Sequence, residues 1–452
     1  MIDLLISLRT LVWGMPTLLL MGSTGLFLTL RLRFLQARKL GTALRSALGN
    51  KNEKSVSGVT SRQALCTALA GTVGTGNIAG VAGALAIGGP GAVFWMWVAA
   101  FFGMATKFAE AVLAVRYRKK DDQGRWIGGP MWYIERGLGR SWRPLAKWFC
   151  LCGSLAAFGM GNITQINTAA RAVHAAAAVA GAPPIPGAVL GLGLAAVIGT
   201  VLLGGAKRVG ASAEQLVPLM SVLYLFGTLG VILTHLPALP AALGAIIRGA
   251  FHPAALGGGL AGVSFQAAMR AGVSRGVFSN EAGLGSAPIA YASADTDSPM
   301  RQGLSGVVEV FVDTILLCSL TALCILCSGV PIPYGGDAGS ELLVSALGAT
   351  FYGPLPSILT AVGLLLFALS SVLSWGLYGT RCIEYLLGGR AVPAYRLAYA
   401  ACAIPAAIVT PAFAWVLADV LNGLMAVPNL LAVLLLSKEV QRIAKNAGFV
   451  HK

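Results

Sequence analysis

The chain alternates between long apolar stretches and short polar stretches rich in Lys and Arg. Many of the apolar stretches reach about 18 residues, the length at which a helix can cross a hydrocarbon core about 30 Å thick. The runs are continuous rather than alternating, which predicts helices and not barrel strands. The pattern predicts about eleven transmembrane helices, at residues 12–30, 63–88, 91–115, 146–178, 187–204, 213–235, 257–290, 303–328, 354–386, 394–409 and 412–437.

Composition supports the same class. Hydrophobic residues make up 56% of the 452 residues and charged residues only 11%, whereas soluble domains carry about 25% charged residues. The sequence therefore predicts an all-α polytopic membrane protein, with residues 1–452 forming one transmembrane domain in a lipid bilayer.

The net charge of +16 could indicate a nucleic-acid partner, but the distribution of the charge does not favour one. Most Lys and Arg residues fall in 31–62, 116–147 and 438–452, which lie on one side of the predicted bilayer. The positive-inside rule places that side in the cytoplasm, with the N-terminus outside and 438–452 as a cytoplasmic tail. Segment 12–30 lacks a basic leader and a cleavage site, so we expect a retained helix. The predicted location is the cell membrane, the inner membrane in a bacterium.

Two of the predicted helices contain sequences that break helices. GTVGTGNIAG occupies 71–80 and FSNEAGLGSAP occupies 278–288. A membrane helix can unwind only where its backbone faces protein or a water-filled cavity. Two simpler interpretations remain open: Gly76 and Gly80 also fit a small-residue packing motif, and the second sequence could be a cytoplasmic loop.

The two breaks also suggest an internal repeat. With 12–30 set aside, residues 63–235 and 257–437 form two five-helix halves, each opening with its broken helix. The two opening helices run in opposite directions across the bilayer. This arrangement predicts an inverted repeat with substrate held near the midplane.

Other functional classes lack their usual motifs. The eight cysteines lie in apolar segments, and Cys324-x-x-Cys327 has no second pair or histidine beside it, so neither a disulfide framework nor a redox site is expected. The four histidines are widely spaced, and neither H-E-x-x-H nor G-x-S-x-G occurs, which argues against an enzyme. A channel would show a filter or pore ring instead of paired breaks.

Several sequence blocks carry a family resemblance. GPGAVFWMW through FFGMATKFAE (89–110), GTVGTGNIAGVAGA, FSNEAGLGSAPIA, and GLYG followed by CIEYL (376–386) resemble, in the same order, blocks of the alanine or glycine:cation symporter family, also called the sodium:alanine symporter family. The resemblance extends from about residue 10 to 440. It implies a leucine-transporter-type fold, with one helix ahead of a 5+5 inverted repeat. It also implies sodium-coupled uptake of a small neutral amino acid.

A zwitterionic substrate needs partners for both of its charges inside the membrane. Unwound glycine backbone offers N–H groups and allows close approach, so the first break is the expected carboxylate site. Phe158, Asn162 and Gln165 share one face of the fourth helix, where the amides either line the substrate cavity or join helices. The expected substrate-binding residues are Gly74, Thr75, Gly76, Asn77, Phe158, Gln165, Phe278, Ser371 and Trp375, with Phe278 and Trp375 as aromatic walls.

The resemblance also implies a coupling Na⁺ between the first broken helix and the ninth helix. Carbonyl and hydroxyl oxygens are suitable ligands for such an ion, and we expect them from Gly71, Thr72, Gly74, Ser370, Ser371 and Ser374. The alternative is that these serines bond to carbonyls of their own helix.

Ionisable residues inside the predicted membrane are functional candidates. Lys107 and Glu110 have a spacing that predicts an internal ion pair. Pairing is likewise expected for Glu281, Glu309, Asp313, Arg270 and Arg275, in gating or structural networks. The sequence leaves open alanine, glycine or glutamine as substrate and Na⁺ or H⁺ as coupling ion, so a proton-coupled or glutamine-preferring transporter is the alternative.

Overall fold

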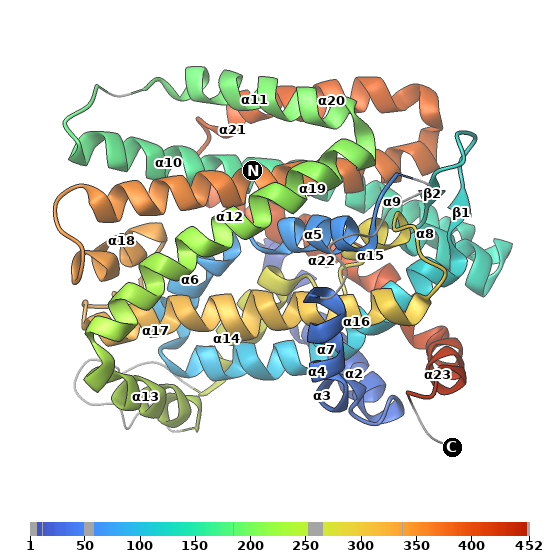
Figure 1. Ribbon diagram of the computed structural model, residues 1–452, viewed down its shortest axis with the longest axis horizontal. Helices are drawn as coiled ribbons and strands as arrows, with labels where there is room; N and C mark the ends of the chain where they lie inside the picture. Colours follow the sequence, from blue (N-terminus) through green and yellow to red (C-terminus); the bar gives the residue numbers. More distant parts are fainter. Residues whose placement is uncertain are drawn as a thin grey trace.

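The computed structural model describes residues 7–10, 12–48, 58–183, 185–251, 265–336 and 338–449. Helices dominate this part of the chain, and most of them run roughly parallel to one axis of the molecule (Figure 1). In the described residues, six helices are long and apolar enough to span a membrane, or seven if one bent pair counts as a single span. The described part of the chain is therefore predominantly α-helical with several possible membrane spans, as the sequence predicted, although these are fewer than the predicted eleven.

The first predicted break is present. Helix α5 (Ser61–Thr72) begins with a capping box, in which Thr60 and Gln63 each accept a backbone N–H from the other. It ends before a 3₁₀ turn, η1 (Thr75–Asn77), and the chain continues as α6 (Ala79–Gly88). The two halves are bent by 53°. The glycines at 71–80 thus interrupt a membrane helix and do more than pack against a neighbour.

The second break lies between α14 (Phe265–Asn280) and α15 (Ala287–Ala292). Within it Glu281, Gly283 and Gly285 have φ values of 54°, 93° and 83°. These left-handed conformations cannot continue a right-handed helix. Residues 257–264 of the predicted helix 257–290 lie outside the described residues.

Six long segments surround the two breaks. They are α7 (Gly91–Tyr117), α12 (Gly205–Thr234), α19 (Leu355–Leu387), α22 (Pro411–Leu435), α9–η4–α10 (Arg143–Phe158, Gly159–Ile163, Thr164–Val179) and α16–η7–α17 (Pro299–Val310, Phe311–Cys318, Ser319–Ser328). The middle pieces η4 and η7 are π-helical, a form that is frequent at functional sites.

The remaining elements lie ahead of the first break, connect the long segments or follow the last of them. They are α2 (Met15–Arg31), α3 (Leu35–Arg38), α4 (Leu40–Leu48), the antiparallel strands β1 (Lys119–Lys120) and β2 (Trp126–Ile127), α8 (Pro130–Tyr133), η2 (Ile134–Leu138), η3 (Arg140–Trp142), α11 (Gly187–Leu203), η5 (Leu236–Ala238), α13 (Leu239–Phe251), α18 (Ser340–Gly348), η8 (Gly389–Ala391), α20 (Val392–Ala401), α21 (Ala403–Ala406) and α23 (Ser437–Asn446).

Some predicted boundaries differ from the structure. Helix α12 begins at Gly205, so Lys207 and Arg208 lie in its first turns and not in the expected loop. The expected helix 394–409 is divided into α20 and α21. Residues 437–446 of the expected tail form α23, and 450–452 lie outside the described residues.

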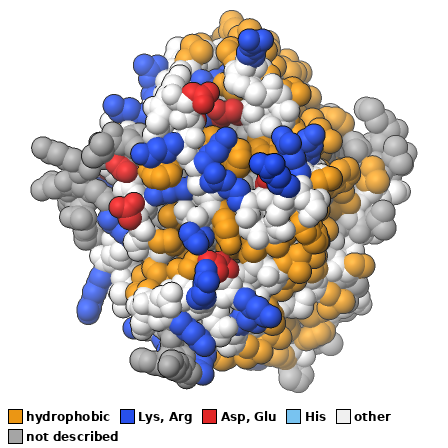
Figure 2. Space-filling model, turned by 90° about the vertical axis from the view of Figure 1, so that its right-hand side faces the viewer, with side chains coloured by type: hydrophobic (Ala, Val, Ile, Leu, Met, Phe, Trp, Pro, Cys, Tyr) orange, Lys and Arg blue, Asp and Glu red, His pale blue; other side chains and the backbone are white. Residues whose placement is uncertain are grey.

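The surface separates into apolar sides and a basic end. Leu192, Leu203, Phe226 and Leu233 on α11 and α12 are more than half exposed, as expected for side chains that face lipid. Lys and Arg side chains gather on the end of the molecule that carries α8, α23 and the β1–β2 hairpin (Figure 2). Inside, α7 packs against α14 and α16, which places the second break beside a buried charged cluster.

Candidate functional site

The first break is buried and is held by side chains from other helices. The Gly74 N–H donates to Asn77 Oδ1 at 2.9 Å, and the Thr75 N–H donates to Gln165 Oε1 at 3.1 Å. Gln165 on α10 therefore faces the break, as expected for a residue of this site. Both N–H groups are engaged in this conformation, so an incoming carboxylate would have to displace one of these amides.

Asn77 connects the break to η7 and α17. Its Nδ2 donates to Asp313 Oδ1 at 2.7 Å, and its carbonyl accepts the Thr321 hydroxyl at 2.6 Å. Asp313 Oδ2 also accepts the hydroxyl of Ser279, the residue next to Phe278 in α14, at 2.8 Å. Asp313 thus joins the first break to the end of α14, where the second break begins.

Two hydroxyls at the candidate site are buried without a hydrogen-bond partner among the described residues. They are Thr75 Oγ1, in the first break, and Ser374 Oγ, on α19. A buried polar group without a partner costs about 1–3 kcal/mol. Unpaired groups of this kind are the places where a ligand or an ion would restore a bond.

The serines of α19 do not all face the break. Ser371 Oγ lies 3.4 Å from the Val73 carbonyl oxygen, and a Cβ on Gly74 would lie 2.6 Å from the same hydroxyl. Only a glycine at position 74 leaves room for the Ser371 hydroxyl to lie this close to the backbone. Ser370 Oγ instead donates to the Phe367 carbonyl at 2.9 Å, the local bond that sequence analysis kept as an alternative.

The other two expected ion ligands, Gly71 and Thr72, lie in the last turn of α5. A Cβ on Gly71 would lie 2.9 Å from the Tyr378 hydroxyl oxygen. Thr72 Oγ1 bonds to the carbonyls of Ala68 and Leu69 at 3.2 and 3.3 Å. Val73, which was not among the expected ligands, contributes the carbonyl that Ser371 approaches; its position between Thr72 and Gly74, two expected ligands, could have suggested it.

The two expected aromatic walls are both buried, at 1% exposure for Phe278 and 0% for Trp375. A Cβ on Gly76 would lie 3.4 Å from the Phe278 ring, so Phe278 covers the first break. Its other neighbour is Trp415 of α22, with ring centroids 5.1 Å apart. Trp415 could not be predicted as part of this site, since a tryptophan in an apolar helix gives no signal of its own.

Phe158 does not share a face with Gln165. Its ring contacts Tyr395 and Tyr399 at centroid distances of 5.3 and 5.5 Å, and Asn162 Nδ2 donates to the Tyr399 carbonyl at 2.7 Å. The π-helical η4 lies between Phe158 and Gln165 and changes the rotation per residue, so the regular helical spacing behind the expectation does not apply.

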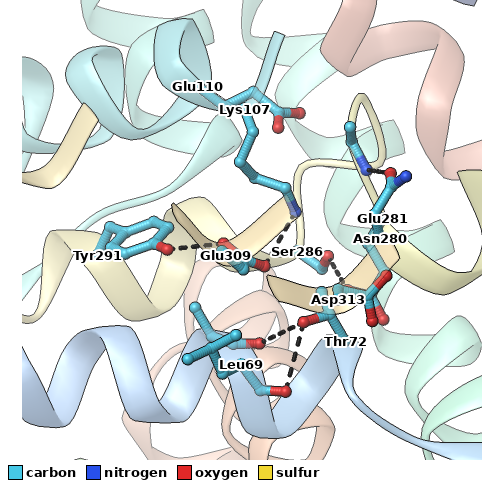
Figure 3. Close-up of polar contacts among 12 residues, drawn as sticks. Leu69, Thr72, Lys107, Glu110, Asn280, Glu281, Ser286, Tyr291, Glu309 and Asp313 are labelled. Atoms are coloured by element: carbon cyan, nitrogen blue, oxygen red, sulfur yellow. Dashed lines mark hydrogen bonds and ion pairs between the residues drawn. The ribbon is translucent and has the colours of Figure 1, made fainter. Parts of the chain in front are cut away.

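A charged cluster lies behind the second break (Figure 3). Lys107 Nζ pairs with Glu309 Oε1 at 3.2 Å, and both side chains are fully buried. The expected Lys107–Glu110 pair is therefore wrong, because Lys107 forms its ion pair with Glu309 of α16. Glu110 Oε1 accepts from Asn429 Nδ2 at 2.5 Å instead.

The two arginines of α14 also differ from expectation. Neither Arg270 nor Arg275 forms an ion pair with an acidic residue in the described chain, within 4.0 Å. The Arg275 guanidinium lies 5.3 Å from the ring centroid of Trp415 and 5.9 Å from that of Phe278, so its close contacts are aromatic rings.

Comparison with known sequences gives matches along the whole chain. Residues 2–448 match the family model of the sodium:alanine symporter family. The sodium/alanine symporter AgcS of Methanococcus maripaludis is 44% identical over 100% of this chain and 98% of its own length. An uncharacterized transporter of Haemophilus influenzae is 43% identical, covering 97% and 94%. The probable sodium/glutamine symporter GlnT of Bacillus subtilis is 37% identical, covering 95% and 87%.

Two solved structures are similar in fold. The transporter MhsT in complex with L-phenylalanine gives a TM-score of 0.57 at 15% identity, covering 85% of this chain and 97% of that one. Mhp1, a nucleobase-cation-symport-1 family transporter, gives 0.51 at 12% identity, covering 88% and 98%. Both have the leucine-transporter-type fold. At these identities the similarity establishes the fold alone.

Proposed function

Because the chain belongs to the sodium:alanine symporter family, we propose that it couples sodium entry to the uptake of alanine or glycine by alternating access. The family and the relatives are transporters, so the protein is a multi-pass membrane transporter and not an enzyme. The amino acid, the ion and their binding residues are the parts that we propose.

The observation that carries the proposal is the first break, where the Thr75 hydroxyl is buried without a hydrogen-bond partner in the described part of the chain. A neutral amino acid needs partners for its carboxylate and ammonium groups, which are costly to bury alone. We assign the carboxylate to Gly74, Thr75 and Gly76, where the backbone can be approached closely, and we assign Asn77 to holding the break open. Gln165, already bonded to Thr75, would exchange that bond for one to the substrate.

Phe278 and Trp375 support a small substrate. Phe278 covers Gly76 from the side of α14, and Trp375 packs against Gly161 of η4. With these two rings as its proposed walls, the site would accept a methyl-sized side chain better than a branched or aromatic one. Trp415, whose ring is tilted by 36° against that of Phe278 at a centroid distance of 5.1 Å, is added to the proposed wall.

We place the coupling Na⁺ between Ser371, Ser374 and the carbonyls at the end of α5. Sodium prefers oxygen ligands, and the Ser374 hydroxyl is buried without a partner among the described residues. Ser371 already lies beside the Val73 carbonyl. Of the six residues expected from sequence, Ser370 is the least suitable in this conformation, because its hydroxyl is bonded within α19.

The proposal includes the arrangement in the membrane. Residues 63–235 and 257–437 would form the two inverted five-helix halves, with 12–30 as the additional helix. The basic end of the molecule (Figure 2) would face the cytoplasm.

A glutamine-preferring transporter is the second candidate, since a probable sodium/glutamine symporter is 37% identical to the chain. The test is uptake of labelled alanine by proteoliposomes under an imposed sodium gradient, with glutamine and an imposed proton gradient as parallel arms. Accumulation driven by protons alone, or of glutamine in preference to alanine, would favour the alternatives.

A further inference from the structure

We propose that Glu281 is a specificity-determining positioning residue, whose carboxylate fixes the indole of Trp375 and so limits the size of the substrate side chain. The inference rests on the proposed function, in which Trp375 forms one wall of the amino-acid site. Glu281 belongs to the second break, and Trp375 belongs to α19, so the bond between them joins two separate elements.

The contact itself is direct. Trp375 Nε1–H donates to Glu281 Oε1 at 2.9 Å, and the Ser286 hydroxyl donates to Glu281 Oε2. Both Trp375 and Glu281 have an exposed fraction of 0%. Because both side chains are buried away from water, the hydrogen bond between them is stronger than it would be at the surface. The indole is therefore held at its polar edge in one orientation.

The backbone at Glu281 indicates that the side chain is needed there. Its φ of 54° is left-handed, a region that residues other than glycine rarely occupy. Gly283 and Gly285 in the same break also have positive φ values, and glycine would be the easier choice at 281 as well. A glutamate in this conformation places its carboxylate between Ser286 and the Trp375 indole.

The neighbours of Trp375 other than Glu281 also restrict the movement of its indole ring. A Cβ on Gly161 would lie 2.2 Å from Trp375 Cβ, so the base of the tryptophan side chain rests directly on the η4 backbone. The Tyr378 ring meets the indole edge-on at a centroid distance of 5.7 Å. With the base, one edge and the N–H all fixed, a bulkier substrate would have to break the bond to Glu281.

The experiment compares Glu281→Ala, Glu281→Gln, Trp375→Phe and the double variant Glu281→Ala/Trp375→Phe. The alanine-over-leucine preference is measured by competition against labelled alanine, in uptake where transport persists and otherwise in binding to purified protein. Glu281→Ala and Trp375→Phe should each reduce the preference, by roughly tenfold if the wall can then move aside. The double variant should reduce it no further, because both changes remove the same bond.

Glu281→Gln should retain the wild-type preference, because its amide oxygen still accepts the indole N–H although the charge is gone. Tyr291→Phe is the matched control: it removes another buried hydrogen bond, to Glu309 Oε2 at 2.6 Å, from the same charged cluster. That variant should keep the preference. If Glu281→Ala does not fold, Trp375→Phe and Glu281→Gln together still test the bond.

The inference is overturned by an unchanged preference in a folded Glu281→Ala protein, or by Glu281→Gln behaving like Glu281→Ala, which would assign the effect to charge. Additive effects in the double variant would also contradict it. Failure of the proposed function would give a different result: the wild-type protein would not accumulate alanine under a sodium gradient.

Discussion

Ser370 and Ser371 are neighbours on α19, yet their hydroxyls have different surroundings. Ser371 Oγ lies 3.4 Å from the Val73 carbonyl oxygen in the first break, whereas Ser370 Oγ is bonded to Phe367 within the helix. Adjacent residues of a helix point in directions about 100° apart, and only one of the two can face the break. This difference allows the ion site to be tested with a matched pair of variants.

Ser371→Ala should raise the half-saturating sodium concentration for alanine uptake by roughly tenfold, because the sodium ion loses one of its oxygen ligands. Maximal uptake at saturating sodium should change less. Ser370→Ala is the control and should shift the sodium dependence much less. Equal shifts in the two variants, or none in Ser371→Ala, would remove Ser371 from the ion site.

Substitutions of Gly76 test the proposed substrate site. A Cβ there would make ordinary contact with the Phe278 ring at 3.4 Å, so Gly76→Ala should be tolerated with a modest loss of alanine affinity. Gly76→Leu would extend into the ring and the space proposed for the substrate. It should lower alanine affinity by more than roughly tenfold while the protein remains folded and inserted.

The measurement is binding of labelled alanine to purified protein, with size-exclusion behaviour as the check on folding. Wild-type affinity in a folded Gly76→Leu protein would place the substrate site elsewhere.

At the scale of helices, the sequence predicted the breaks but not the π-helical pieces. Glycine, asparagine and proline clusters inside apolar runs are visible in the sequence, and α5 and α14 end where such clusters begin. The π-helical η4 has no comparable signature, so Phe158 and Gln165 were placed on one face although Phe158 packs against Tyr395 and Tyr399. The start of α12 was missed because Gly204, Gly205, Lys207 and Arg208 read as a loop.

The partners of buried charged residues on other helices could not be predicted from the spacing of residues along one helix. Lys107 and Glu110 are three residues apart on α7, which suggested a pair. The structure joins Lys107 to Glu309 on α16 and Glu110 to Asn429 on α22. A single sequence shows that such buried charges need partners, but which distant helix supplies each partner depends on how the helices pack.

At the scale of the whole molecule, Lys and Arg side chains gather on one end (Figure 2), and the proposed orientation places that end in the cytoplasm. Asp122 lies in the turn between β1 and β2 at the basic end, and Tyr352, which is 87% exposed, lies between α18 and α19 near the opposite end (Figure 1). In whole cells, a membrane-impermeant thiol reagent should label Tyr352→Cys, and it should label Asp122→Cys only after lysis. Seven of the eight native cysteines are buried and Cys402 is partly exposed, so background labelling should be low. Labelling of Asp122→Cys in whole cells, and of Tyr352→Cys only after lysis, would show that the orientation is the reverse of the proposed one.

Membership of the family, the shared fold and the first break all lead to one central claim, that sodium entry drives concentrative uptake of a small neutral amino acid. The most direct test uses purified protein in sealed proteoliposomes with sodium outside and potassium inside, and follows labelled alanine over time. Internal alanine should rise transiently above the external concentration, and the rise should disappear when sodium is equal on both sides or when Gly76→Leu replaces the wild type. Equilibration without accumulation under the sodium gradient would contradict it.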